Sequence, residues 1–219
     1  MFYGQFDPPT DSVIARFFPA GFVGSCVEVG AVDGRHMSNT LYFEEAGWKC
    51  LCIEPNEHYH EALRMNRKHF LPYAVSSRNQ DGVVLHRVKI GDAYDACTSL
   101  ELDQTLISQF KRVINEQDEI LVNARTLDSC MEEAGFSEVD FVTIDTEGTE
   151  LSVLQGFDIA RWKPALVVIE NNHDTPRVDA HLLALGYPKI LNHAVNDFYM
   201  RVLAPRRDGR DLASVVGRH

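Results

Sequence analysis

The chain has 219 residues, of which 45% are hydrophobic and 24% are charged, and its formal net charge is −11. This length and composition predict a single soluble domain. The negative charge disfavours nucleic acids and anionic membranes as partners, because both bind through clusters of Lys and Arg, and no apolar run approaches the roughly 18 residues needed for membrane insertion.

The cysteines and the amino terminus predict a cytoplasmic protein. The chain has five cysteines and no Cys-x-x-Cys pair. An odd number with this spacing indicates reduced thiols, not a disulfide framework or a zinc site. Residues 1–9 lack the basic and apolar regions of a signal peptide.

Strand and helix patterns alternate along the first half of the chain. Residues 1–24 are expected to form a helical segment before the first strand, with a helix at 11–18. Strands are predicted at 25–29, 49–53, 70–75 and 83–88, and helices at 38–46 and 57–69. Ser38 is a candidate cap for the helix that it begins.

The alternation continues in the second half. Strands are predicted at 119–124, 139–144, 165–169, 189–193 and 198–202, and helices at 126–134, 150–155 and 178–185. Alternating strands and helices favour an α/β fold, with one mostly parallel sheet and helices on both faces. Residues 1–205 are expected to form one domain, followed by a loose tail at 206–219.

The first two predicted strands end in residues that suit a nucleoside. Gly30 lets the backbone turn sharply where a side chain would collide with a ligand, and Gly34 is expected where the next helix begins. Glu54, 24 residues after Gly30, is placed to accept hydrogen bonds from a ribose diol. The glycines lack the Gly-x-Gly-x-x-Gly spacing that cradles a pyrophosphate. The ligand predicted is therefore a nucleoside without phosphates, of which S-adenosylmethionine is the common one.

Polar residues also follow two later strands. Asp145 ends one of them, and Glu170 and Asn171 end the next. These three side chains are placed to converge as oxygen ligands for Mg²⁺, which would acidify a substrate hydroxyl. The alternative gives Asp145 the positively charged amino group of S-adenosylmethionine, and the sequence does not separate the two.

His173 is a candidate general base for a hydroxyl group. It follows Glu170 and Asn171, and a histidine titrates near neutral pH. His193, near the end of a later strand, is a second candidate. The alternative is that residues 172–176 form only a polar turn.

A series of short motifs extends along almost the whole chain. They are YGQ at 3–5, VEVGAVDG at 27–34, SNT at 38–40, GWK at 47–49, IEPN at 53–56, TLD at 126–128 and IDTEGTEL at 144–151. Their order and spacing resemble those of the FkbM-type methyltransferases, and the resemblance covers roughly residues 3–202.

This resemblance implies a fold, a cofactor and a chemistry. The fold would be that of class I methyltransferases, a Rossmann-like domain with a seven-stranded sheet and a reversed last strand. S-adenosylmethionine would be the methyl donor, and the acceptor would be a hydroxyl group. Ser38 and Asn39 would bind the carboxylate of the donor, Glu54 its ribose, and Asp145 its amino group or a metal. Two departures are Asp33, where many relatives carry Asn, and Asn171, which replaces a second acid.

The predicted site residues are as follows. The cofactor-binding set is Glu28, Gly30, Asp33, Ser38, Asn39, Glu54, Ala74, Val75, Ser76 and Asp145. The catalytic set is His173 and Asp145, and the metal set is Asp145, Glu170 and Asn171.

The predicted function is O-methylation of a sugar hydroxyl in a polysaccharide, glycolipid or glycosylated natural product. Residues 91–118 are expected to form the acceptor side of the site, where Asp92, Tyr94 and Asp95 suit hydrogen bonding to a sugar. The alternatives are an oxidoreductase that binds an NAD-type dinucleotide and a non-catalytic module that keeps the fold. The oligomeric state stays open.

Overall fold

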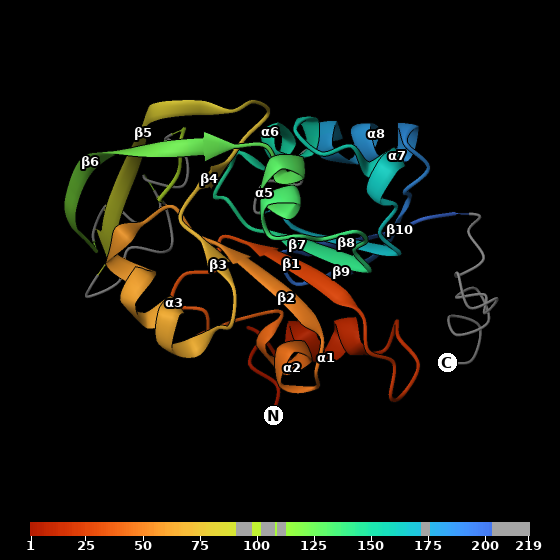
Figure 1. The fold of residues 1–219 in the computed structure, drawn as a ribbon. Helices are drawn as coiled ribbons and strands as arrows, with labels where there is room; N and C mark the ends of the chain where they lie inside the picture. The colour runs from red at the N-terminus through yellow and green to blue at the C-terminus, as the bar shows by residue number, and fades with distance from the viewer. Residues whose placement is uncertain (91–97, 102–107, 109–112, 172–175, 203–219) are drawn as a thin grey trace.

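A seven-stranded sheet with helices on both faces forms the body of the protein (Figure 1), as the sequence predicts. The computed structural model describes residues 1–90, 98–101, 108, 113–171 and 176–202. In spatial order the strands are β3 (Phe70–Leu71), β2 (Lys49–Ile53), β1 (Ser25–Val29), β7 (Phe141–Ile144), β8 (Leu166–Glu170), β10 (Asn196–Met200) and β9 (Lys189–His193).

The direction of the strands matches the expected pattern. β1 pairs in parallel with both β2 and β7, and β7 pairs in parallel with β8. β10 is antiparallel to both of its neighbours, which makes it the reversed strand. The chain moves outward from β1 to β2 and β3, and then returns to the other side of β1 as β7. Strand order therefore reverses between β1 and β7, the place where open α/β sheets bind their ligands.

Helices cover both faces of the sheet (Figure 1). One face carries α5 (Leu127–Glu133), α6 (Glu150–Gln155), α7 (Ile159–Trp162) and α8 (Pro176–Ala184), and the other carries α1 (Thr10–Ala15), α2 (Leu41–Glu45), the 3₁₀ turn η1 (Glu57–Tyr59) and α3 (His60–Asn66). Val27 and Val29 belong to the core under α5–α8, whereas Cys26 packs with α1 and α2. Alternate residues of β1 thus face opposite layers.

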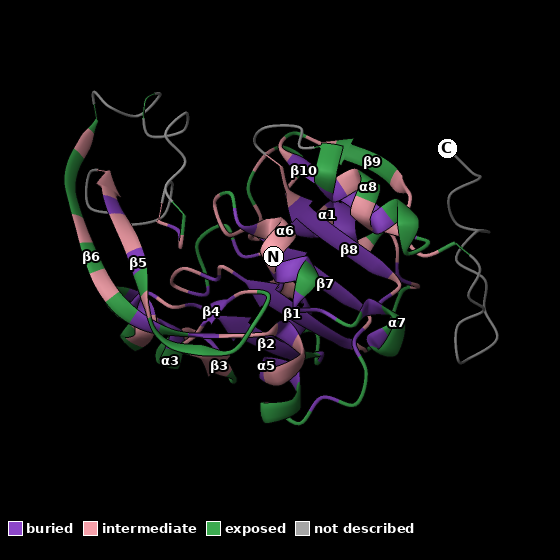
Figure 2. Cartoon of the chain, turned by 90° about the horizontal axis from the view of Figure 1, so that it is seen from above, coloured by how far each residue is buried: buried purple, intermediate pink, exposed green. Residues whose placement is uncertain are grey.

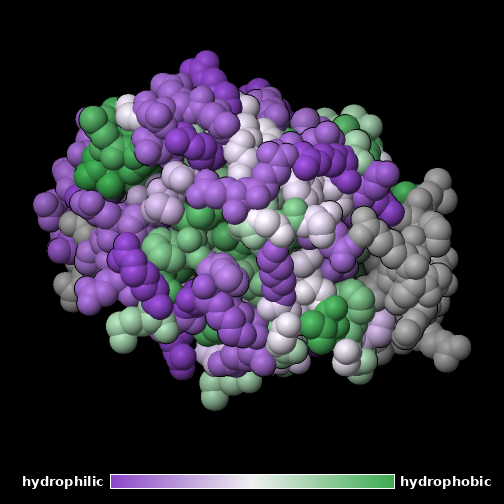
Figure 3. Space-filling view, viewed as in Figure 1, coloured by the Kyte–Doolittle hydropathy of each residue, from purple (hydrophilic) through white to green (hydrophobic). Residues whose placement is uncertain are grey.

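A long hairpin projects from this body. Its strands are β5 (Gln80–Ile90) and β6 (Ile114–Arg125), and β4 (Ala74–Val75) pairs in parallel with β6. The central strands are buried and the hairpin is largely half-buried or exposed (Figure 2). A hydrophobic group lies over the hairpin in Figure 3, where Val84 and Leu121 pair in register and are 38% and 73% exposed.

The structure corrects several predicted boundaries. The single strand predicted at 70–75 is wrong, because β3 and β4 belong to different sheets. The helix predicted at 38–46 begins only at Leu41. Gly34 does not begin a helix: it packs against α3, where an added Cβ would lie 2.6 Å from Cγ of Arg67. Most of the insertion predicted at 91–118 lies outside the described residues, and its end belongs to β6.

No helix within the described part of the chain is long and apolar enough to cross a membrane. The predicted tail at 206–219 lies outside the described residues.

Gly30 is required by the packing of two strand ends. Its φ is +81°, and an added Cβ would lie 1.8 Å from the backbone oxygen of Asp145, the residue after β7. The sequence correctly indicates a sharp turn here, but the group that excludes a side chain is the protein's own backbone. The turn after β1 therefore lies directly on the end of β7.

We expect Gly30→Ala to lower the free energy of unfolding by at least about 3 kcal/mol, because the clash adds to the strain of a positive φ. Gly21→Ala is the matched control: φ there is +77°, yet nothing lies within 4 Å of the added Cβ. That variant should lose only about 1–2 kcal/mol. Urea unfolding of both variants measures the difference, and equal losses would contradict the proposed close contact.

Candidate active site

A cavity of about 570 Å³ lies at the carboxyl ends of the central strands. Its walls include the ends of β1, β2, β4, β7 and β8, together with the loops that follow them. Of the predicted cofactor residues, those that line it are Glu28, Gly30, Ser38, Asn39, Glu54, Ala74, Val75 and Asp145. The site residues named from the sequence thus largely share one cavity.

Glu54 occupies one end of this cavity as a buried carboxylate. Oε2 accepts a hydrogen bond from the backbone N–H of Val32 at 3.0 Å, and Oε1 accepts one from Asn56 at 2.8 Å. Burial nevertheless raises the pKa of Glu54 to about 7, because these two bonds offset the loss of water only in part. Each oxygen keeps a lone pair with which to accept from a ligand hydroxyl.

Glu28 organises the loop that follows β1. Its carboxylate accepts from Ser38 Oγ at 2.8 Å, from the backbone N–H of Asn39 at 2.6 Å and from Thr40 Oγ1 at 2.6 Å. It also pairs with the guanidinium of Arg67 at 3.0 Å. Glu28 lines the cavity, but its oxygens are engaged with the protein itself.

The backbone N–H groups around Ser38 make their hydrogen bonds within the chain. The backbone N–H groups of Thr40 and Leu41 donate to Ser38 Oγ at 3.2 and 3.0 Å. Those of Ser38 and Asn39 donate to Arg35 O and to Glu28. These four N–H groups are therefore already paired within the chain, so they do not form the carboxylate site expected there.

Asn39 carries a polar atom that the protein leaves without a partner. Its Nδ2 donates to Thr143 Oγ1 at 3.2 Å, whereas its Oδ1 is buried and has no hydrogen-bond partner among the described residues. Buried polar atoms are nearly always satisfied. Since Asn39 lines the cavity, a small rotation of its side chain would present this oxygen to a ligand that donates a hydrogen bond, such as an amino group.

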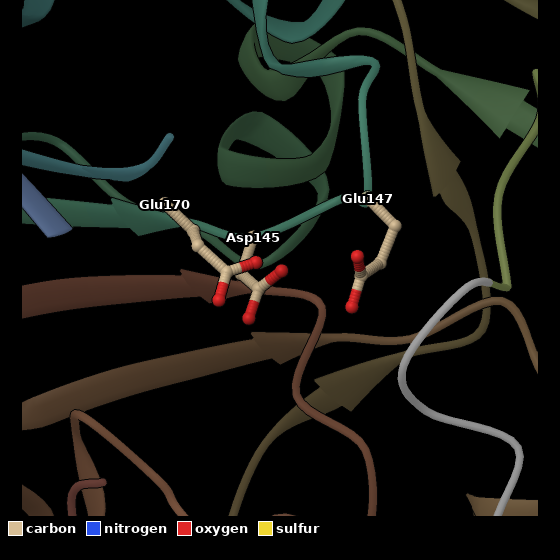
Figure 4. A group of neighbouring side chains, drawn as sticks. All are labelled: Asp145, Glu147 and Glu170. Carbon is tan, nitrogen blue, oxygen red and sulfur yellow. The ribbon is translucent and has the colours of Figure 1, made fainter. Parts of the chain in front are cut away.

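Three carboxylates gather at the other end of the cavity. Asp145 and Glu170 lie side by side at the ends of neighbouring strands, and Glu147 reaches toward them from the loop after β7 (Figure 4). One oxygen from each lies within 4.8 Å of the others. Burial, followed by repulsion from Glu170 and Glu147, raises the pKa of Asp145 well above its usual value, and a hydrogen bond joins Asp145 to Glu170.

The metal set predicted from the sequence gains one residue and loses another. Glu147 belongs to the group, whereas Asn171 lies outside the cavity lining and its Nδ2 donates to Asp197 Oδ2 at 2.9 Å. Asn171 is drawn toward β10, where the carboxylate of Asp197 lies. Carboxylate oxygens are the type of ligand that Mg²⁺ and Ca²⁺ prefer, so this group is a candidate cation site.

The amino-terminal segment forms a wall of the cavity that the sequence does not assign to the site. Gln5, Phe6 and Thr10 line it. Asp11 fixes the segment by accepting from the backbone N–H groups of Tyr3 and Gly4 at 2.7 and 3.1 Å. Phe6 has a φ of +77°, which is rare for a bulky residue and marks a strongly constrained backbone. In the sequence, the YGQ motif at 3–5 is the one feature that singles out this segment.

Residues from the connection between β5 and β6 also reach the cavity. Thr98, Ser99 and Leu100 line it, and Ser99 Oγ donates to the backbone oxygen of Thr146 at 2.9 Å. The backbones of Ser99 and His86 exchange hydrogen bonds at 3.0 Å, which ties this segment to β5. Part of the inserted region thus lies beside the carboxylates.

Some predicted residues lie elsewhere. Asp33 closes a local turn by accepting from the backbone N–H groups of Arg35 and His36, and Ser76 contacts Ser152. Neither belongs to the cavity lining. His193 Nε2 lies 2.8 Å from the backbone oxygen of Pro8, also away from the lining. His173, Asp92, Tyr94 and Asp95 lie outside the described residues.

Comparison with known protein families gives one match. Residues 28–189, which contain the end of β1, all of β2, β7 and β8 and the carboxylates at their ends, match the family described as the methyltransferase FkbM domain. A comparison with curated protein sequences gave no match.

The raised pKa of Glu54 predicts a specific dependence of stability on pH. Because this pKa is higher in the folded chain than in the unfolded one, protonated Glu54 stabilises the fold below about pH 4.5, and this contribution is lost as the pH rises through about 7. Relative to Glu54→Gln, the free energy of unfolding of the wild type should fall by roughly 3 kcal/mol between about pH 4.5 and about pH 8.5.

Denaturant unfolding of the two proteins across this range measures the effect. Using the difference between them removes the contribution of other titrating groups. Parallel pH profiles would contradict the buried, ionisable state of Glu54.

Proposed function

The chain belongs to the FkbM methyltransferase family, and from this membership we propose that it transfers a methyl group from S-adenosylmethionine to a hydroxyl group of a sugar. The observation that carries the proposal is the convergence of Glu54, Asn39 and Asp145 on one cavity. The cavity lies where strand order reverses, and its two ends differ in chemistry as the two ends of this cofactor do.

The nucleoside would occupy the end formed by β2 and β4. Glu54 would accept hydrogen bonds from the ribose hydroxyls, while Ala74, Val75 and Leu85 would provide an apolar surface for the adenine. The amino group would lie near Asn39 Oδ1 and Asp145, which offer an unpaired acceptor and a carboxylate. The methyl group would then lie beside Glu147 and Glu170, where an acceptor can approach.

The reaction would be a direct displacement at the methyl carbon. The acceptor oxygen forms a bond to that carbon as the bond from carbon to sulfur breaks, and most of the rate enhancement comes from holding the three atoms in line. The hydroxyl proton would pass to a carboxylate of the Asp145–Glu170 pair, because the two share a hydrogen bond and the pKa of Asp145 is raised. His173 stays the alternative base.

The charge of the cavity wall favours a neutral acceptor. The described lining contains five carboxylates, those of Glu28, Glu54, Asp145, Glu147 and Glu170, and no Lys or Arg. A net negative charge on the acceptor would be repelled here, whereas the carboxylate of S-adenosylmethionine is offset by the positive charges of its own amino and sulfonium groups. Sugar hydroxyls, in contrast, donate hydrogen bonds to carboxylates.

The three carboxylates also suit a divalent cation, as an alternative to the amino group of the cofactor. Asp145, Glu147 and Glu170 would supply three oxygen ligands, and the ion would acidify the acceptor hydroxyl. We favour the amino group at Asp145, because the unpaired Asn39 Oδ1 accepts from an amino group and the same cavity joins it to Glu54. An NAD-type ligand is disfavoured by the family match and by the absence of a pyrophosphate-binding glycine pattern.

We expect S-adenosylhomocysteine to bind with a micromolar dissociation constant, and Glu54→Ala to weaken binding by about 10- to 100-fold, because hydrogen bonds to a charged group are lost. Isothermal titration calorimetry measures both values. Glu57→Ala is a matched control, since Glu57 is exposed and lies three residues away on η1. Tight binding that Glu54→Ala leaves unchanged would contradict this placement of the ribose.

Adding Mg²⁺ distinguishes whether the three carboxylates bind the amino group of the cofactor or a divalent cation. With the amino group at Asp145, adding Mg²⁺ after EDTA treatment should change the affinity for S-adenosylhomocysteine by less than about twofold. A larger increase that Glu147→Gln abolishes would favour the cation. Calorimetry on the wild type and this variant, with and without Mg²⁺, makes the comparison.

A further inference from the structure

A buried ionic network lies behind the wall of the cavity. The side chain of Arg67, the residue that follows α3, is fully buried. Its Nη1 pairs with Glu28 Oε2 and its Nε with Glu44 Oε2, each at 3.0 Å. Glu28 lies on β1 and Glu44 on α2, so the guanidinium joins three separate elements.

The remaining donors of Arg67 reach the loop between β1 and α2. Nη2 donates to Thr40 Oγ1 at 2.7 Å, and Nη1 donates to Ser38 Oγ and to the backbone oxygen of Gly34, both at 3.2 Å. A planar guanidinium presents its donors in a fixed arrangement, which lysine cannot reproduce. The position of one side chain therefore fixes both ends of this loop.

Glu28 connects Arg67 to the cavity wall. Both faces of β1 are buried, so the carboxylate of Glu28 depends on Arg67 and on hydroxyl donors to offset its desolvation. Its other oxygen holds the backbone N–H of Asn39 at 2.6 Å. Arg67 does not belong to the cavity lining, whereas Glu28 and Asn39 do.

We propose that Arg67 is a positioning residue for the amino-acid end of the cofactor. It holds Glu28, which in turn holds the backbone of Asn39 and places the Asn39 amide beside Thr143. This assignment rests on the proposed function. The ribose end is held by a different set of contacts, from Glu54 to Val32 and Asn56.

The separation of these two sets of contacts makes the proposal testable with two ligands. S-adenosylhomocysteine carries both the nucleoside and the amino-acid end. Methylthioadenosine carries the nucleoside and the sulfur but lacks the amino acid. A residue that positions only the amino-acid end affects the first ligand selectively, whereas general damage to the fold affects both.

The experiment is calorimetric titration of the full chain with both ligands, comparing the wild type with Arg67→Lys. We expect S-adenosylhomocysteine to bind about tenfold more weakly to Arg67→Lys and methylthioadenosine to change by less than about twofold. Arg64→Lys is the matched control, because Arg64 is exposed on the same helix. It should leave both affinities unchanged.

Thr40→Val is a second, milder variant for use if Arg67→Lys does not fold. It removes the hydroxyl that joins Arg67 to Glu28 and keeps the side-chain shape. It should show the same selectivity with a smaller loss. Equal weakening of both ligands, or unchanged binding of S-adenosylhomocysteine, in a folded variant would overturn the proposal. Failure of the wild type to bind either ligand would overturn the proposed function itself, and this assignment with it.

Discussion

The contact between Gly30 and the backbone of Asp145 is the constraint on which the site depends. A side chain at position 30 would overlap the backbone oxygen of Asp145, so the turn after β1 can lie against the end of β7 only when that residue is glycine. This contact closes the point where strand order reverses. Asp145 thereby lies beside the turn after β1, and Glu54, which follows the neighbouring strand β2, lies in the wall of the same cavity.

The cavity wall combines two kinds of buried charge, and they have different physical roles. Glu28 is surrounded by hydrogen-bond donors from the protein and shapes the loop that carries Asn39. Glu54 and Asp145 are desolvated, no cationic side chain in the described part of the chain pairs with either of them, and their pKa values are raised. Groups left in this condition gain most from a ligand that donates hydrogen bonds or carries positive charge, as S-adenosylmethionine does.

The sequence predicted the parts of the site that local pattern and strand order determine. Glu54 and Asp145 were placed together because the carboxyl ends of parallel strands meet at one edge of a sheet. Residues 70–75 were misjudged, since the pairing of Ala74–Val75 with β6 depends on a partner about 50 residues away. The hydrogen bond from Asn171 to Asp197 is likewise not predictable from strand order, because Asp197 lies on the antiparallel strand β10. Such long-range pairings leave no periodic signal in the sequence.

The central claim is that a single cavity binds both ends of S-adenosylmethionine, and a crystal structure of the chain with S-adenosylhomocysteine tests it most directly. The account predicts the ribose hydroxyls on Glu54 and the amino group within hydrogen-bond distance of Asn39 Oδ1 and Asp145. A ligand bound in the reverse direction, with its amino acid at Glu54, or bound outside this cavity, would contradict it.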